Sequence, residues 1–298
     1  MSLFDRLVDH ALKTKADLAP LRVVVEKELL HHDILREMSS AGLLDSLTFI
    51  GGTCLRACYG SSRLSEDLDF TGGQDFRREN LALLGRVLVA NLQRKYDLRV
   101  EVAEPVRESG QVDTWKLRVV TRPEQKDLPA QRIHIDICAI PSYDRRPMML
   151  RNIYEVDMGT SGLIIQAQSR EEILADKLLA FALRPNRLKN RDLWDIAWLK
   201  QQQVELPLDL IPKKIVDHRQ SVGSFTAQLT ARRELLRTNP ATRDDFVTEM
   251  RRFLPVQVVT ETVENPDFWR YLADLVGTEA DRVIGFLSDG GVEARFRM

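Results

Sequence analysis

The sequence predicts an α+β protein in which a mixed α/β half is followed by a helical half. A short β-prone run at residues 48–50 meets a glycine pair and then helix-forming residues, which indicates a strand, a tight turn and a helix. Residues 132–140 alternate apolar and polar side chains with the period of a strand. After Gln168 the pattern is almost wholly helical. We therefore expect an α/β domain with an N-terminal helix at residues 1–165 and a helical domain at residues 166–298.

The other elements follow from the spacing of apolar residues. Residues 21–38 place apolar side chains loosely along one helical face, and residues 80–93 do so more clearly. The segment at 67–70 alternates as a strand does. Residues 98–102 and 115–120 also alternate with a period of two, so we expect them to pair as neighbouring strands.

The helical half has recognisable start and stop signals. Ser169 is a suitable N-cap, acidic residues follow it in the first turn, and the helix is expected to run to Arg184 before a proline. A second helix is expected at residues 192–202. The remaining segment, divided by prolines, predicts shorter helices.

Composition excludes several classes of protein. Lys and Arg number 43 and Asp and Glu 44, a net charge of −1, which excludes a uniformly basic nucleic-acid coat protein but allows local basic clusters. The longest apolar run, residues 178–183, is far shorter than the roughly 20 residues that span a bilayer. Charges at Asp5, Arg6 and Asp9 interrupt any signal-peptide core, and the three cysteines lack redox spacing. We expect a cytoplasmic protein without a membrane segment.

Three acidic residues on predicted strands suggest a metal site. Asp67 and Asp69 are two apart in a strand and therefore share a face, where two carboxylates repel unless a cation lies between them. Oxygen ligands suit Mg²⁺, and Asp136 on a later strand would bridge a second ion or act as general base. Alone, the Asp67-Leu68-Asp69 motif is also typical of a solvated strand edge or a cap, and a glycine pair is typical of an ordinary turn. His134 and Cys138 share a face with Asp136, but no second cluster completes a zinc site.

The glycine turn offers donors to a phosphate. Gly51 and Gly52 allow close approach to the backbone, and the amides that open the following helix, with the Thr53 hydroxyl, would face an anion. Arg63 and Ser65 are candidates to steer a triphosphate and to support the acidic loop. Loop residues of these types are also commonly only solvated.

Lys177 is a charged residue in an apolar setting. At 100° per residue it lies among the apolar side chains of its helix, and a buried lysine is costly unless it is paired. A functional role or an ion pair is expected, and the alternative is an ammonium group that reaches solvent past Phe181. Asp192 and Asp195 share a helical face. Asp192 is also explained as a helix cap, whereas Asp195 is expected to orient Lys177, Arg191 or a nucleotide-bound metal.

Basic residues cluster in the helical half. They suit a polyanion backbone, so we expect RNA binding there, although solvated helix faces explain such runs equally simply. The main cluster is Arg184, Arg187, Lys189 and Arg191, and the bias continues through Lys213, Lys214, His218, Arg219, Arg232, Arg233 and Arg237.

At these motifs the sequence resembles a known family. The run FIGGTCLR at residues 49–56, continued by RLSEDLDF at 63–70, resembles the first motif of the AbiEii/AbiGii-type nucleotidyltransferase toxins, which include the mycobacterial MenT toxins. ADKLLA at 175–180 and RDLWD at 191–195 resemble later motifs of that family.

The resemblance implies a DNA-polymerase-β-like nucleotidyltransferase fold. It implies that Asp67 and Asp69 are metal ligands and that Lys177 and Asp195 engage the nucleotide. Members of the family are toxins of type IV toxin–antitoxin or abortive-infection pairs, and some transfer nucleotides to the acceptor end of tRNA. Thr53 stands where the wider superfamily usually has serine, which keeps a hydroxyl.

Together these observations predict an enzyme that uses two Mg²⁺ ions to transfer NMP from an NTP to an acceptor hydroxyl, with a tRNA 3′ end as the favoured acceptor. A cognate antitoxin encoded upstream is the expected partner. Two alternatives stay open: the same chemistry on a small molecule or a protein hydroxyl, and a non-catalytic module that binds a partner.

Overall fold

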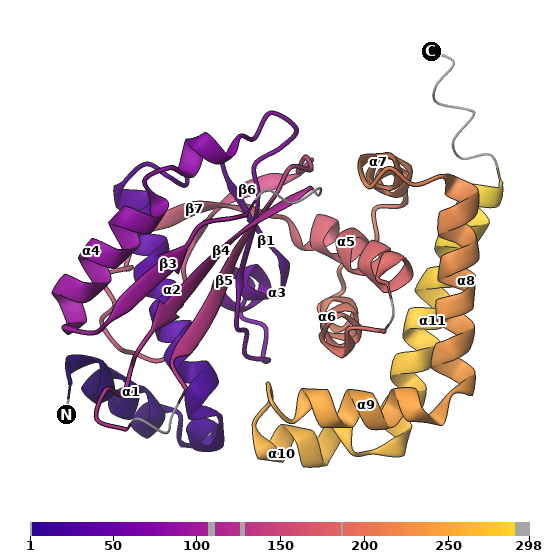
Figure 1. Cartoon of the computed structure of the whole chain (residues 1–298). Helices are drawn as coiled ribbons and strands as arrows, with labels where there is room; N and C mark the ends of the chain where they lie inside the picture. Colours follow the sequence, from indigo (N-terminus) through magenta and orange to yellow (C-terminus); the bar gives the residue numbers. More distant parts are fainter. Residues whose placement is uncertain (1, 107–110, 126–128, 186, 290–298) are drawn as a thin grey trace. The chain divides into compact units, whose positions relative to one another are not determined.

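The computed structural model describes residues 2–106, 111–125, 129–185 and 187–289. The chain divides into two compact units, Met1–Gln168 and Ser169–Met298 (Figure 1). The division follows strand β7 (Ile164–Gln168), which the expected boundary at residue 165 would have cut.

The first unit contains one mixed sheet. Its seven strands lie in the order β3-β4-β5-β2-β1-β7-β6. The β1–β7 and β2–β5 pairs are parallel, and the other four neighbouring pairs are antiparallel. The other strands are β1 (Thr48–Ile50), β2 (Leu68–Thr71), β3 (Val100–Ala103), β4 (Val112–Val119), β5 (Gln131–Cys138) and β6 (Arg145–Met149).

Alternating side chains give the sheet an apolar and a polar face. Phe70, Trp115, Ile135 and Ile137 are buried on one face, where helix α2 (Arg22–Ser40) packs against β5 and helix α4 (Leu84–Tyr96) against β3. These strands were expected from their alternation, and the predicted pairing of residues 98–102 with 115–120 is confirmed as β3–β4. The unit also has helices α1 (Leu3–Thr14), α2 (Arg22–Ser40), α3 (Gly51–Cys54) and α4 (Leu84–Tyr96), 3₁₀ turns at Ala16–Leu21 and Arg78–Leu81, and a π-helical turn at Leu55–Tyr59.

Helix α1 was not predicted, although its first turn carries a clear start signal. The Ser2 hydroxyl accepts a hydrogen bond from the Asp5 backbone N–H at 3.1 Å, and the Asp5 carboxylate accepts one from the Ser2 N–H at 3.2 Å, which completes a capping box. Phe4, Val8 and Ala11 then bury one stripe of the helix.

The second unit is helical, as predicted. The Ser169 hydroxyl accepts a hydrogen bond from the Glu172 backbone N–H at 3.1 Å, which confirms Ser169 as the cap of the first helix. Within the parts of the chain that the structure describes, no helix is long and apolar enough to cross a membrane. The helices are α5 (Arg170–Leu183), α6 (Asn190–Gln201), α7 (Ile211–Asp217), α8 (Val222–Thr238), α9 (Pro240–Met250), α10 (Val256–Val258) and α11 (Pro266–Ser288), with a 3₁₀ turn at Leu208–Leu210 and a π-helical turn at Val259–Val263.

Candidate active site

The three predicted acids lie on the polar face of the sheet. Asp69 and Asp136 are direct partners in the parallel β2–β5 register, and Asp67 immediately precedes β2. All three are half-buried, whereas Leu68 between the first two is fully buried on the opposite face. The sheet therefore brings together three acids from distant parts of the sequence, since Asp67 and Asp136 are 69 residues apart.

Hydrogen bonds fix two of these carboxylates. Asp67 Oδ1 accepts the backbone N–H of His134 at 3.0 Å, so this side chain lies against strand β5. Asp136 Oδ1 accepts the hydroxyl of Thr114, its partner on β4, at 2.6 Å. Each of these carboxylates keeps a second oxygen, and each is still partly open to solvent.

The glycine turn lies against Asp69. Gly51 has a φ of +76°, and a Cβ at that position would lie 2.8 Å from Asp69 Oδ2. The residue must therefore be glycine both for its left-handed backbone and for the space that the carboxylate occupies. This contact places the start of α3 beside the predicted metal ligand.

Gly51→Ala is accordingly expected to displace Asp69 and to reduce nucleotide transfer at least about tenfold, with a loss of about 1–3 kcal/mol in the free energy of unfolding. Paired assays of transfer and chemical unfolding measure both effects. Gly162→Ala is the matched control, since Gly162 also has a positive φ (+76°) but its Cβ would meet no atom within 4 Å. Unchanged transfer in Gly51→Ala would show that the turn does not set the carboxylate.

Gly52 is also required by close packing. A Cβ there would overlap the Arg63 guanidinium group, which lies directly against this glycine. Arg63 is only 3% exposed, and its Nη1 donates to the Leu64 carbonyl at 3.1 Å. This side chain therefore supports the glycine turn from inside the unit, and its expected role in steering a triphosphate stays a prediction.

Ser65 supports the acidic segment together with Thr53, in agreement with one of its two expected roles. Both are buried, and their hydroxyls lie 2.6 Å apart. The Thr53 hydroxyl also donates to the Asp67 carbonyl, so it is not a free donor for a phosphate. These hydroxyls tie the glycine turn to the acidic segment.

The donor set fits Mg²⁺ in chemistry. Carboxylate oxygens are its preferred protein ligands, and it commonly takes one or two of them and completes its shell with water and substrate phosphates. In the described residues, no three His, Cys, Asp or Glu side chains are gathered closely enough to hold a metal by themselves. The assignment of Asp67, Asp69 and Asp136 to two Mg²⁺ ions, with water and substrate phosphates as further ligands, stays a prediction.

In the helical unit, Lys177 is held between two acids. Its Nζ lies 2.6 Å from Asp192 Oδ1 and 2.8 Å from Asp195 Oδ2, and its side chain is 10% exposed. Asp195 is fully buried and Asp192 nearly so. Asp192 therefore serves as an ion-pair partner, and its side chain does not cap α6.

The charges around Asp192 decide its ionisation. Burial alone would raise the pKa of this carboxyl, but the neighbouring Lys177, Lys189 and Arg184 outweigh burial and hold the pKa well below its usual range. Arg184 Nε lies 3.2 Å from Asp192 Oδ2. The carboxylate is thus charged throughout the physiological range, and it keeps the Lys177 ammonium group in place.

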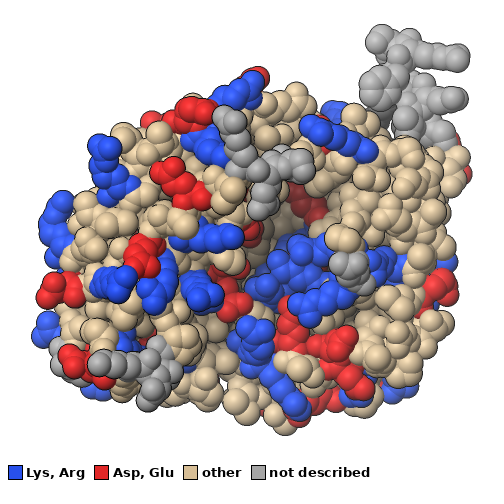
Figure 2. All heavy atoms as spheres, viewed as in Figure 1, with Lys and Arg blue, Asp and Glu red and all other residues tan. Residues whose placement is uncertain are grey.

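The predicted RNA-binding residues have different surroundings. Arg187 is exposed, whereas Arg184 pairs with Asp192 and Arg191 lies 3.4 Å from Glu249 and stacks on Phe253. Burial lowers the pKa of Lys189. On the face that Figure 2 shows, basic and acidic side chains are interspersed.

Lys214 does not belong with the solvent-facing basic residues. It is 1% exposed, and its Nζ lies 2.8 Å from Glu172 Oε1 and 2.6 Å from Asp176 Oδ1. Burial alone would lower its pKa, but these two acids raise it. The expectation that this lysine adds to a polyanion-binding surface is wrong, because it is an internal ion-pair residue that joins α7 to α5.

Comparison with known proteins assigns the family. Residues 33–274 match the family of the nucleotidyl transferase AbiEii toxin of type IV toxin–antitoxin systems. No curated protein sequence matches the chain. Among solved structures, MenT4, a nucleotidyltransferase toxin from Mycobacterium tuberculosis H37Rv, is 18% identical, with 95% of this chain and 98% of that chain covered and a TM-score of 0.53.

JHP933 from Helicobacter pylori is also 18% identical over 90% of this chain and 94% of that chain, with a TM-score of 0.45. The similarity to MenT4 supports the nucleotidyltransferase fold, and the family match covers most of the chain, including the glycine turn, the acids and Lys177. The chain therefore belongs to the AbiEii family of nucleotidyltransferase toxins of type IV toxin–antitoxin systems.

Proposed function

We propose that this protein transfers NMP from an NTP to an acceptor hydroxyl in an Mg²⁺-dependent reaction, and that the acceptor is the 3′ end of a tRNA. One observation carries the proposal: Asp69 and Asp136 are paired across two strands, with Asp67 on the same face and the glycine turn in contact with Asp69. This arrangement concentrates negative charge next to a backbone that can approach a phosphate closely.

The acids of the sheet would hold the metal. Asp67 and Asp69 are the proposed ligands, and Asp136 is the proposed ligand of a second ion or the base that takes the proton of the acceptor hydroxyl. When bound, Mg²⁺ would offset the negative charge of the phosphate oxygens. The chain's own contribution is to fix the carboxylates through His134 N–H and the Thr114 hydroxyl.

The glycine turn is proposed to bind the nucleotide through its backbone. Gly51 and Gly52 present no side chain, and Arg63 fills the space beneath Gly52. Thr53 and Ser65 keep the turn and the acidic segment at a fixed separation through their hydroxyl contact. Nucleotide specificity would then depend on residues that contact the base, whereas the phosphates are bound by the backbone.

The helical unit is proposed to supply positive charge. Lys177, oriented by Asp192 and Asp195, is the proposed nucleotide-binding cation. Arg184, Arg187, Lys189 and Arg191 are the proposed contacts to the RNA backbone, and Arg187 is the most exposed of them. Phosphate contacts of this kind give affinity without sequence specificity, so selection of one RNA would need additional contacts.

The acceptor class can be identified by labelling. The purified protein, incubated with Mg²⁺, a lysate and each NTP in turn labelled at the α-phosphate, is expected to place the label on small RNA. The label should disappear on treatment with ribonuclease and resist protease. Label on protein or on small metabolites would refute the tRNA acceptor while retaining the enzymatic assignment. A complete absence of transfer would favour the non-catalytic alternative.

The family implies an antitoxin partner. We propose that it is encoded upstream and that it relieves the growth inhibition caused by transfer. Co-expression of the upstream gene with this chain should restore growth to that of cells carrying an Asp67→Asn variant.

A further inference from the structure

The buried contacts of helix α2 indicate a residue that controls the acidic segment. We propose that Glu28 is a positioning residue for the nucleotidyl-transfer site: it fixes the segment at residues 65–67 and thereby sets the place of the Asp67 carboxylate. The proposal rests on the function proposed above. Glu28 itself touches no reacting group, since its side chain is 6% exposed and it accepts hydrogen bonds from Arg56, Ser65 and Tyr154.

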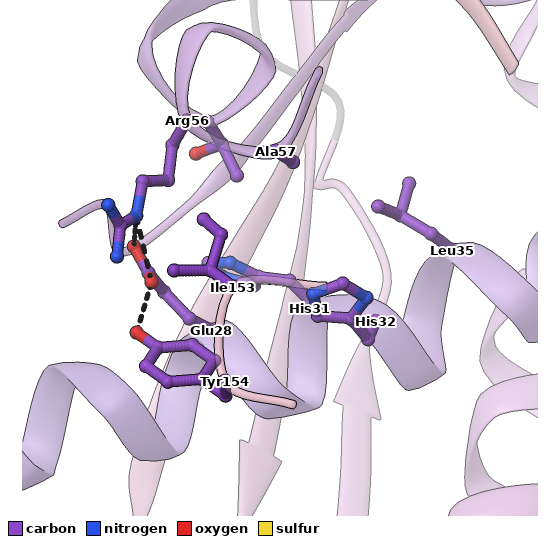
Figure 3. Close-up of a pocket in the computed structure, with 9 residues that line it drawn as sticks. Glu28, His31, His32, Leu35, Arg56, Ala57, Ile153 and Tyr154 are labelled. Atoms are coloured by element: carbon purple, nitrogen blue, oxygen red, sulfur yellow. Dashed lines mark hydrogen bonds and ion pairs between the residues drawn. The ribbon is translucent and has the colours of Figure 1, made fainter. Parts of the chain in front are cut away.

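Glu28 binds the segment directly. Its Oε1 accepts the backbone N–H of Ser65 at 2.9 Å. The other donors are the Arg56 guanidinium, whose Nε lies 3.2 and 3.3 Å from the two oxygens, and the Tyr154 hydroxyl (Figure 3). A buried carboxylate with this many donors is held in one orientation, because losing any of the contacts would leave charge or a donor unpaired.

Two other residues of helix α2 bind Glu66, the residue that follows Ser65. Lys27 Nζ lies 3.0 Å from Glu66 Oε1, and His31 Nε2 lies 3.0 Å from the Glu66 carbonyl. Burial lowers the pKa of His31 to about 4, so the ring is neutral near pH 7. Because a carbonyl only accepts, the proton of the neutral ring is on Nε2. Successive residues of the segment are therefore bound to one helix.

The opposite side of the segment is bound to the glycine turn. The Thr53 hydroxyl contacts the Ser65 hydroxyl and donates to the Asp67 carbonyl. Asp67 is thus the end of a short segment that is fixed from two sides, by α2 and by α3. Metal ligands depend on such outer contacts, and their removal typically costs 10–100-fold in metal affinity or activity.

The cavity beside Glu28 is too small for a substrate, so the role of Glu28 is to hold neighbouring residues in place. The adjoining cavity, lined by Glu28, His31, Thr53 and Tyr154 among others, has a volume of about 20 Å³. That is room for about one water molecule and far too little for a nucleotide. Arg56 also binds the chain just before this segment, since its Nη1 donates to the Ser61 carbonyl at 2.9 Å.

Glu28→Gln tests the proposal, because it replaces one oxygen by an N–H₂ group that faces the Arg56 and Tyr154 donors. We expect the half-saturating Mg²⁺ concentration for transfer to rise about 10–100-fold, or kcat to fall to the same extent, with little change in the KM for NTP. Hydrogen exchange of the amides at residues 65–67, measured without metal or nucleotide, should accelerate. Tyr154→Phe removes one donor from Glu28 and should shift both readouts in the same direction by less.

Asp33→Asn is the matched control. Asp33 is a fully buried acid of the same helix, paired with Arg36 at 2.9 Å and Lys95 at 2.5 Å, and these partners lie outside the segment at residues 65–67. It should lower thermal stability comparably but leave the Mg²⁺ dependence and the exchange at 65–67 unchanged. Wild-type exchange in Glu28→Gln, or an equal shift in Asp33→Asn, would overturn the proposal. If the wild-type protein shows no transfer, the proposed function fails, and the exchange measurement alone still decides the role of Glu28.

Discussion

Replacing Asp67 or Asp69 by asparagine is expected to lower nucleotide transfer at least about 1000-fold, equivalent to about 4 kcal/mol in the activation free energy. The amide keeps the size of the side chain and, in Asp67→Asn, an oxygen that still accepts the His134 N–H. It removes the negative charge on which binding of a cation depends. Transfer of α-phosphate label to RNA, measured at several Mg²⁺ concentrations, checks the effect.

The stability of these variants should be unchanged or slightly higher, because neutralising one acid relieves repulsion between carboxylates on the same face. Asp113→Asn is a suitable control: this half-buried acid of strand β4 pairs with Arg78 and is not one of the proposed ligands. It should transfer at the wild-type rate. Loss of transfer in the control, or transfer in both Asp67→Asn and Asp69→Asn, would contradict the proposed metal ligands.

Lys177→Met is expected to have two large effects. It leaves Asp192 and Asp195 buried beside a missing cation, and breaking a buried ion pair typically costs about 3–5 kcal/mol in the free energy of unfolding. It also removes the proposed nucleotide-binding charge, so transfer should fall at least about 100-fold at a temperature where the variant is folded. Chemical unfolding and nucleotide binding by calorimetry separate the two effects.

Lys214→Met provides the comparison for the structural effect. Like Lys177, Lys214 is a buried lysine bonded to two acids, and one helix, α5, is involved in both clusters. Its loss should destabilise the helical unit similarly but leave nucleotide binding intact in the folded protein. If the two variants bind nucleotide equally well, Lys177 is only an ion-pair residue.

The sequence predicted the site best where a local pattern, such as alternation along a strand or a glycine pair, determines the structure. The glycine pair was expected as a turn between a strand and a helix, and it opens helix α3 directly after β1. Asp69 lies on strand β2 as expected and Asp67 immediately precedes it, and a period of two fixes which side chains share a face. The alternation in residues 132–140 likewise put Asp136 on the polar face. The register that pairs Asp69 with Asp136 could not be predicted, since it depends on a parallel pairing between distant segments.

Other features were missed because their signals are weak or non-local. Strand β6 has exposed charged residues, and β7 is recognisable through its pairing with β1 and β6. Glu28 looks like one acid among several on an amphipathic helix. Its role depends on Arg56, Ser65 and Tyr154, which come from distant parts of the chain. A buried acid cannot be told from a solvated one by composition alone.

The numbers of basic and acidic residues do not show which cations are buried and which lie on the surface. Lys214 and Arg187 look alike in the sequence, yet one is fully buried between acids and the other is exposed. A basic run therefore overstates the surface available to RNA, because part of it neutralises the protein's own carboxylates.

The most direct test of the central claim compares the position of the label in the NTP. The purified protein, Mg²⁺ and tRNA are incubated with NTP labelled either at the α-phosphate or at the γ-phosphate. Nucleotidyl transfer predicts that α-label becomes attached to the tRNA 3′ end and that γ-label is released as pyrophosphate, with both events lost in Asp67→Asn. Attachment of γ-label to RNA, or α-label transfer that persists in Asp67→Asn and without Mg²⁺, would contradict the account.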